Sequence, residues 1–152
     1  MIDPGRFTAT LDERGRLTLP RKIRNRLPPE LWLLPGFDGC IFIVDSSRWQ
    51  QVLTELSEIS WNDPDGTDIQ RFFAQAHTDT CDRQGRVSIP QHLLAHAGIE
   101  REVVLLGALD RVEVWSPVRY ATYAERALND ARIREIRERK LTARSQAGES
   151  SR

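Results

Sequence analysis

Apolar and polar residues alternate on both sides of a short turn near the start of the chain. Before residue 12, apolar residues at every second position alternate with threonine. After Gly15, Leu17 and Leu19 alternate with Arg16 and Thr18. A period of two is typical of strands with one buried face. Gly15 can adopt the positive φ that a tight turn requires. We therefore predict a strand, a turn and a second strand.

A short helix, a β-hairpin and a longer helix are predicted next. Apolar residues four positions apart follow Pro20, which is a favourable first residue for a helix. Two apolar runs, 31–34 and 40–44, are separated by a connection rich in glycine and aspartate, as in a hairpin. Asp45 can then cap a helix whose apolar face continues to Ile59.

The same order of elements recurs 70 residues later. Residues 10–20 and 80–90 share threonine, aspartate, glycine, arginine and proline at equivalent positions. Apolar runs at 102–106 and 111–115 and a helix from Pro117 follow the second copy. A single repeat is too small to bury a comfortable core by itself. We therefore predict an α+β fold in which two pseudo-symmetric repeats share one core.

The domain boundaries follow from this repeat. We expect a first repeat with its helix at 5–59, a linker and short helix at 60–78, and a second repeat with its helix at 79–128. A charged helical extension and a flexible tail, fraying from Ala143, are expected over 129–152. Oppositely charged residues four positions apart predict ion pairs along that extension. The default interpretation of this extension is a solvated helix. An accessory phosphate contact and a subunit-docking arm are the alternatives.

Composition excludes several classes of protein. No stretch of about 18 apolar residues is present, so no transmembrane helix is predicted. The N-terminus lacks the apolar segment of a signal peptide, and a cytoplasmic protein is expected. Cys40 and Cys81 form no CxxC pair, which argues against a zinc finger or a disulfide framework.

The formal net charge of zero hides two basic blocks. The chain has 22 Lys and Arg against 22 Asp and Glu. Residues 12–26 hold six basic and two acidic residues, and residues 119–144 hold eight and four, whereas 27–81 hold two and nine. A basic patch on the first turn and its helix is a plausible phosphate-binding footprint. The alternative is a solvated helix face.

No set of residues predicts an enzyme. His92 and His96 lie four apart on a predicted helix, but the glutamate of an HExxH metal site is absent, so we expect them on a solvated face. Cys81 has no activating partner nearby in sequence, and no glycine-rich phosphate loop is present. We expect no metal, no cofactor and no small-molecule substrate. Four tryptophans are assigned to core or interface: Trp32, Trp49, Trp61 and Trp115. Partial exposure is the alternative for Trp61, which stands next to Asn-Asp-Pro at 62–64.

The duplicated motif resembles the MraZ family, whose members are tandem relatives of the SpoVT/AbrB swapped-hairpin DNA-binding fold. The resemblance rests on Asp-x-x-x-Arg at 12–16 and 82–86, on the context Gly-Arg-(Leu/Val)-x-(Leu/Ile)-Pro, and on Glu-Val-Trp-Ser at 113–116. It covers roughly residues 5–128. The paired motif at this spacing is specific, whereas one Gly-Arg-x-x-x-Pro would not be.

The resemblance implies a small barrel made of two swapped-hairpin repeats, with peripheral helices. It also implies a bacterial transcriptional regulator of the division and cell-wall gene cluster that is associated with the nucleoid. Such a protein would bind repeated promoter boxes of double-stranded DNA as a ring-like homo-oligomer, without a membrane partner. The rival hypothesis is a protein-binding adaptor on the same fold, similar to an antitoxin that grips its partner through the C-terminal segment.

The residues expected to contact DNA are basic and lie in or after the two turns: Arg14, Arg16, Arg21, Lys22, Arg24, Arg83 and Arg86. The residues expected to shape the turns are Asp12, Gly15, Asp82 and Gly85. The short helix at 91–96 has no arginine, unlike its counterpart after the first turn. We therefore expect the first repeat to supply most of the DNA contact and the second to serve packing or assembly. Comparable loss of binding in Arg16→Ala and Arg86→Ala would count against this expectation.

Overall fold

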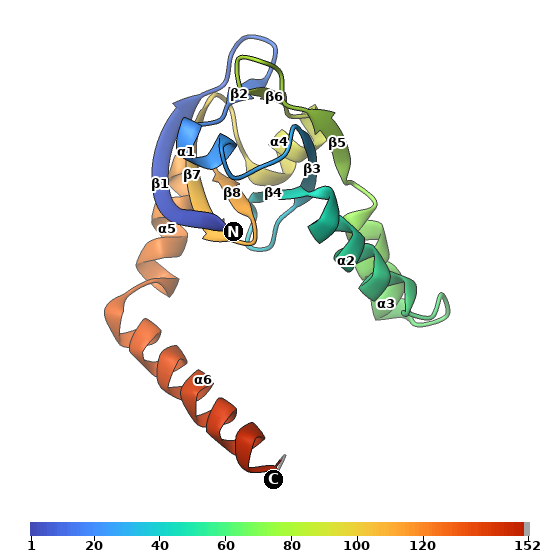
Figure 1. Ribbon diagram of the computed structural model, residues 1–152, viewed down its shortest axis with the longest axis vertical. Helices are drawn as coiled ribbons and strands as arrows, with labels where there is room; N and C mark the ends of the chain where they lie inside the picture. The colour runs from blue at the N-terminus through green and yellow to red at the C-terminus, as the bar shows by residue number, and fades with distance from the viewer. Residues whose placement is uncertain (151–152) are drawn as a thin grey trace. The chain divides into compact units, whose positions relative to one another are not determined.

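The computed structural model describes residues 1–150 (Figure 1). These residues form two compact units, Met1–Pro117 and a second unit that begins at Val118. The strands are β1 (Ile2–Thr10), β2 (Arg16–Thr18), β3 (Glu30–Pro35), β4 (Ile41–Asp45), β5 (His77–Thr80), β6 (Arg86–Ser88), β7 (Glu102–Leu109) and β8 (Val112–Trp115). The helices are α1 (Arg21–Arg24), α2 (Ser46–Ser57), α3 (Pro64–Phe73), α4 (Gln91–Ala97), α5 (Pro117–Ala127) and α6 (Asp130–Ser150).

The main sheet interleaves strands from both repeats. Its order is β1-β7-β8-β4-β3-β5, and all neighbours are antiparallel. β1 corresponds to β5, β3 to β7 and β4 to β8 in the two copies, so the order reads the same from either end. A pseudo-twofold axis therefore passes between β8 and β4, where the two repeats meet.

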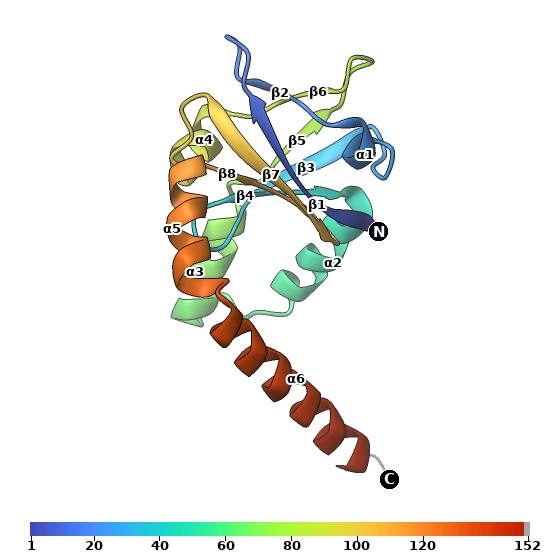
Figure 2. The same cartoon turned by 90° about the vertical axis from the view of Figure 1, so that its left-hand side faces the viewer.

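The two strands that flank each turn do not pair with each other. β1 pairs with β7 of the other repeat, and β2 pairs with β6 in a separate two-stranded ribbon (Figure 2). The ribbon centres on Leu17 opposite Val87, and both side chains are fully buried. The predicted tight turns are present, and the strands on either side of each turn pair with strands of the other repeat. Exchange between the repeats buries both apolar residues in one shared core.

The α+β fold with two repeats is confirmed, but the sheet does not close into a barrel. β1 pairs on one side only, with β7, and β5 pairs on one side only, with β3. The ribbon of β2 and β6 is a separate sheet and does not join these two edges within the described residues. The general arrangement therefore agrees with the expected swapped-hairpin fold, except for barrel closure.

Apolar residues fill both sides of the main sheet. On one side a cluster drawn from both repeats includes Leu17, Leu33 and Val87. On the other side Leu34 packs with Trp49 in a second cluster. Because successive strand residues point to opposite faces, the adjacent residues Leu33 and Leu34 enter different clusters. β3 is thus buried on both faces.

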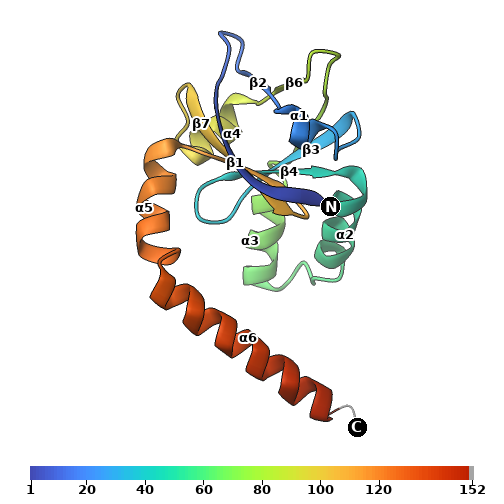
Figure 3. The ribbon, with the colours of Figure 1, turned by 60° about the vertical axis from the view of Figure 1, so that its left-hand side comes forward.

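Helices α2 and α3 lie side by side against the main sheet (Figure 3). The Asp45 carboxylate accepts from the Arg48 amide at 2.8 Å and caps α2. α3 begins at Pro64, inside the stretch expected to be a linker, and is capped by Asp63. Gly66 permits close packing there, since a Cβ on it would meet the Ile59 side chain at 2.1 Å.

The second unit consists of α5 beyond Pro117 and of α6. Arg132 joins these helices, because its Nη1 donates to the Ala127 carbonyl at 2.6 Å. α6 continues to Ser150, through the segment expected to fray. Its side chains are exposed except for the half-buried Ile136, within residues 130–148. The expected ion pairs are not formed among those residues, because exposed charges lose little by remaining hydrated.

No helix in the part of the chain that the structure describes is both long and apolar enough to cross a membrane.

Candidate nucleic-acid interface

Asp12 organises the first turn with both of its carboxylate oxygens. Oδ1 accepts from the amides of Arg14 and Arg16, each at 2.9 Å, and Oδ2 accepts from Arg16 Nε at 2.7 Å. These bonds lower the pKa of Asp12, chiefly through the Arg16 amide. Gly15 completes the turn at φ +73° and donates its amide to the Asp12 carbonyl at 3.0 Å. The Asp12 carboxylate therefore accepts turn amides and pairs with an arginine at the same time.

Asp82 builds the second turn in the same way. Its Oδ1 accepts from the amides of Gln84 and Arg86 at 2.9 Å, and its Oδ2 accepts from Arg86 Nε at 2.8 Å. The pKa of Asp82 is lowered, chiefly by the Arg86 amide. Gly85 has φ +81°. The two turns thus have the same set of carboxylate hydrogen bonds and a glycine with positive φ at the same position.

The ribbon between the turns presents one arginine from each repeat on the same face. Arg16 lies opposite Ser88, and Thr18 lies opposite Arg86. Leu17 and Val87 alternate with them and point into the core. The outer face therefore carries two guanidinium groups and two hydroxyls in a pseudo-twofold pattern. The hydroxyls of Thr18 and Ser88 are exposed and were missed as candidates, although their period of two was visible in the sequence.

The two turns project from the same end of the first unit, beyond the ribbon (Figure 2 and Figure 3). Each turn adds an exposed basic residue, Arg14 in the first and Arg83 in the second. Arg16 and Arg86 use their Nε atoms to brace the turns, and both remain partly exposed, with side chains 25% and 31% accessible. The structure thus brings all four motif arginines to one end of the first unit.

Helix α1 lies beside the second turn rather than its own. Arg24 Nη2 donates to the carbonyl of Arg83 at 2.9 Å, across 59 residues of sequence. Arg21 and Lys22 are exposed on the same helix. Arg24, which follows the first turn in sequence, therefore contacts the second turn in space.

An acidic residue that the sequence did not single out also reaches the ribbon. Asp79 Oδ2 accepts from the Ser88 amide at 2.7 Å. The residue equivalent to Asp79 in the first repeat is Ala9, so the contact exists in one copy only. The contact is local to the second repeat, because Asp79 lies on β5 and Ser88 on β6, on either side of the second turn.

The histidines and cysteines have structural contacts. His92 Nε2 lies 2.8 Å from the Gln75 carbonyl oxygen, and His96 Nε2 lies 3.0 Å from that of Gly36. The expected solvated face is wrong for half-buried His96, because α4 packs against the β3–β4 connection. Burial raises the pKa of both thiols, at Cys40 and Cys81. A thiol that stays protonated is a weak nucleophile.

The fold and this site define a protein of two interlocked repeats whose paired turns and arginine-bearing ribbon face form one surface. The sequence profile of the family described as "MraZ protein, putative antitoxin-like" matches residues 4–72 and again 72–144. The chain belongs to the MraZ family, as its motifs predicted.

Several relatives carry the name transcriptional regulator MraZ. That of Thermomicrobium roseum is 38% identical over 122 residues, which span 80% of this chain and 86% of the relative. That of Heliobacterium modesticaldum is 36% identical, over 81% and 87%. That of Pediococcus pentosaceus is 38% identical, over 76% and 82%. These names describe regulators and no enzyme, so membership confirms the prediction of a non-enzymatic protein.

Proposed function

We propose that this chain is a transcriptional regulator that binds double-stranded DNA through the ribbon and its two turns. The observation that carries the proposal is the placement of Arg16 and Arg86 on one ribbon face. Arg14 and Arg83 extend that face at the turns. A two-stranded ribbon fits the major groove, where arginine can donate two hydrogen bonds to guanine. We also propose that Arg21 and Lys22, which are exposed on α1, bind phosphates beside the ribbon.

A pseudo-twofold protein surface suits DNA whose two strands are themselves related by twofold axes. Each half of the ribbon offers one arginine and one hydroxyl in equivalent positions. One subunit would therefore contact a short DNA box with both repeats. This geometry supports DNA contacts from both repeats. It is less consistent with the expectation that the first repeat supplies most of the DNA contact.

We further propose a homo-oligomeric ring on repeated promoter boxes of the division and cell-wall gene cluster, in the cytoplasm at the nucleoid. Several linked subunits would raise the apparent affinity well above that of one ribbon face. The small number of cations on one face supports a need for such linkage. The mass in solution tests the ring. We expect a multiple of the 17.5 kDa chain well above a dimer, and a monomer at DNA-binding concentrations would contradict it.

The alternative is an antitoxin-like protein-binding adaptor. The printed description of the family and the long exposed helix α6 support this second candidate. The adaptor predicts a tight protein partner and no preference among DNA sequences.

The deciding experiment measures binding to DNA from upstream of the chain's own gene and to a scrambled duplex. Both titrations are run between about 50 and 200 mM salt, and a footprint is taken on the longer fragment. The regulator predicts tighter binding to the native fragment, a footprint over repeated boxes, and a slope of about −0.9 in log K against log salt per neutralised phosphate. Equal or absent binding to both duplexes contradicts it.

A further inference from the structure

Each turn is anchored to the other repeat by one backbone hydrogen bond. The Leu19 amide donates to the Gly85 carbonyl at 2.8 Å, and the Ile89 amide donates to the Gly15 carbonyl at 3.1 Å. Each bond ties one turn to the ribbon strand of the other repeat. The two amides therefore report separately on the second turn and on the first.

A second support differs completely between the turns. Behind the first turn, a Cβ on Gly15 would lie 3.9 Å from Leu94 Cδ1, which belongs to a buried side chain. Behind the second turn, a Cβ on Gly85 would lie 2.9 Å from Arg24 Nη1. Arg24 and Leu94 are separated by the same 70 positions as the repeats. A guanidinium thus stands where its counterpart has an apolar side chain.

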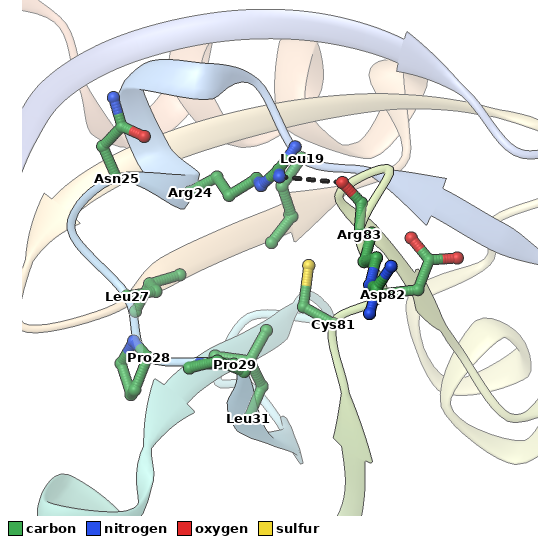
Figure 4. A pocket seen from close by; sticks show the side chains of 10 residues that line it. All are labelled: Leu19, Arg24, Asn25, Leu27, Pro28, Pro29, Leu31, Cys81, Asp82 and Arg83. Atoms are coloured by element: carbon green, nitrogen blue, oxygen red, sulfur yellow. Dashed lines mark hydrogen bonds between the residues drawn. The ribbon is translucent and has the colours of Figure 1, made fainter.

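The Arg24 side chain forms a bridge between the repeats. It extends from α1 and donates through Nη2 to the Arg83 carbonyl at 2.9 Å (Figure 4). A hydrogen bond from a charged donor is stronger than a neutral one. Its acceptor is the backbone of the residue whose side chain we place on DNA.

The space below this bridge is hollow. A cavity of about 300 Å³ is lined by Leu27, Pro29 and Leu31 together with Cys81, Arg24 and the second turn. At the equivalent position behind the first turn, the Leu94 side chain is buried, whereas Arg24 is exposed. The second turn is thus supported by the Arg24 side chain, with this cavity beneath it, whereas the first turn faces the buried Leu94.

We propose that Arg24 is a positioning residue that seats the second turn and thereby aims Arg83 at DNA. The expected effect of Arg24 on DNA binding rests on the proposed function. It assigns Arg24 a role different from that of a direct phosphate contact. The second turn is then the adjustable one of the pair, since a hydrogen bond can yield to water, whereas a packed leucine cannot.

The first test is a double-mutant cycle on DNA binding. It compares the full-length protein with Arg24→Leu, Arg83→Gln and the double variant, and uses Arg21→Leu as the matched control on the same helix. Arg24→Leu installs the side chain found at the equivalent position of the other repeat. We expect it to weaken binding about three- to tenfold in the presence of Arg83, and hardly at all in Arg83→Gln. We expect Arg24→Lys, which can still donate to the carbonyl, to recover part of the loss.

Additive losses in the double variant would overturn the proposal, because they would mean that Arg24 meets DNA independently of Arg83. The proposal would also be overturned if adding Arg24→Leu to Arg83→Gln flattened the slope of log K against log salt by about 0.9, the value for one phosphate contact. Arg21→Leu is expected to lose affinity additively with Arg83→Gln, as an independent phosphate contact does.

The second test needs no DNA and separates this inference from the proposed function. Amide hydrogen exchange is measured in the free protein and in Arg24→Leu. We expect faster exchange at the Leu19 amide, which is anchored to the second turn, and unchanged exchange at the Ile89 amide. Equal changes at both amides, or none at either, would overturn the role of Arg24. A wild-type protein that binds no DNA, yet shows the selective change at Leu19, would contradict only the proposed function.

Discussion

At the scale of single residues, Asp12 and Asp82 organise the two turns through their carboxylates. Each carboxylate accepts two backbone amides and one guanidinium. Because the charged form makes these bonds, folding lowers the pKa of both groups below the ordinary value of 3.8. The stabilisation is therefore present above the unfolded-state pKa and is lost as the pH falls through the folded-state pKa.

Replacing both carboxylates should flatten the acid limb of the stability curve. We expect the wild type to lose free energy of unfolding as the pH falls below about 4, and the double variant Asp12→Asn/Asp82→Asn to lose less. Urea unfolding across a pH series measures this difference. Glu13→Gln removes an exposed carboxylate from the first turn and serves as the control. Equal pH dependence in the wild type and the double variant would refute the assigned role.

Alanine at the two turn glycines should cost unequal amounts of stability. Gly15 and Gly85 both have positive φ, which costs an alanine about 1–2 kcal/mol. Only at Gly85 would the new Cβ also displace the Arg24 side chain, at 2.9 Å. We therefore expect Gly85→Ala to lower the free energy of unfolding more than Gly15→Ala in urea titrations. The reverse order would be inconsistent with the asymmetry of the turns.

The residue-scale contacts were predictable only where they are local. The contact between Asp12 and Arg16 was predictable because the two residues lie four positions apart around a glycine. The contact between Asp82 and Arg86 then follows from the sequence repeat. The bond from Arg24 to Arg83 joins residues 59 apart and depends on the swap. Sequence alone therefore identified Arg24 as basic but placed it beside the wrong turn.

At the scale of elements, the exchange of strands makes each repeat incomplete. β1 has its partner in β7, β2 in β6, and β5 in β3. The core cluster likewise draws Leu17 and Val87 from different repeats. A repeat in isolation would expose its ribbon strand and leave its first strand unpaired.

Neither half of the chain should fold as a monomer. We expect residues 1–76 alone to be unfolded, or to recover the missing pairs by dimerising with a second copy. Residues 1–76 and 77–152, expressed together, should restore the fold. Circular dichroism combined with sedimentation measures this. A cooperatively folded monomer of residues 1–76 would contradict the interlocked arrangement.

The local hairpins were predictable, and the long-range pairing was not. The connections between β3 and β4 and between β7 and β8 are short, so their apolar runs indicate antiparallel neighbours. The pairs β1–β7 and β2–β6 lie far apart in sequence, and nothing in the local pattern selects them over a hairpin. Barrel closure also depends on edge pairing, which a pattern of apolar residues does not determine.

At the scale of the whole molecule, the zero net charge is the sum of separate basic and acidic segments of the chain. The basic residues 12–26 lie on or beside the turns and the ribbon, whereas residues 27–81 are strongly acidic. A local patch of this kind favours docking in a defined orientation over general affinity for polyanions. The second basic block lies mainly on α6, whose side chains through residue 148 are almost all exposed.

Removing most of α6 should leave the stability of the first unit unchanged. A chain that ends at Arg132 keeps the bond from Arg132 to the Ala127 carbonyl. Because the removed residues contribute no fully buried side chain within the described part, we expect the free energy of unfolding to change by less than about 0.5 kcal/mol. Thermal and urea unfolding measure this. A large cooperative loss would mean that α6 supports the fold.

The most direct measurement is the salt dependence of binding to the native DNA fragment in Arg14→Gln, in Arg83→Gln and in the double variant. Arg134→Gln on α6 is the matched control. If both turns meet DNA, each single variant flattens the slope of log K against log salt by about 0.9, and the double variant by about twice that. Slopes that match the control in all three variants would contradict the account, because neither turn would then contact the phosphates.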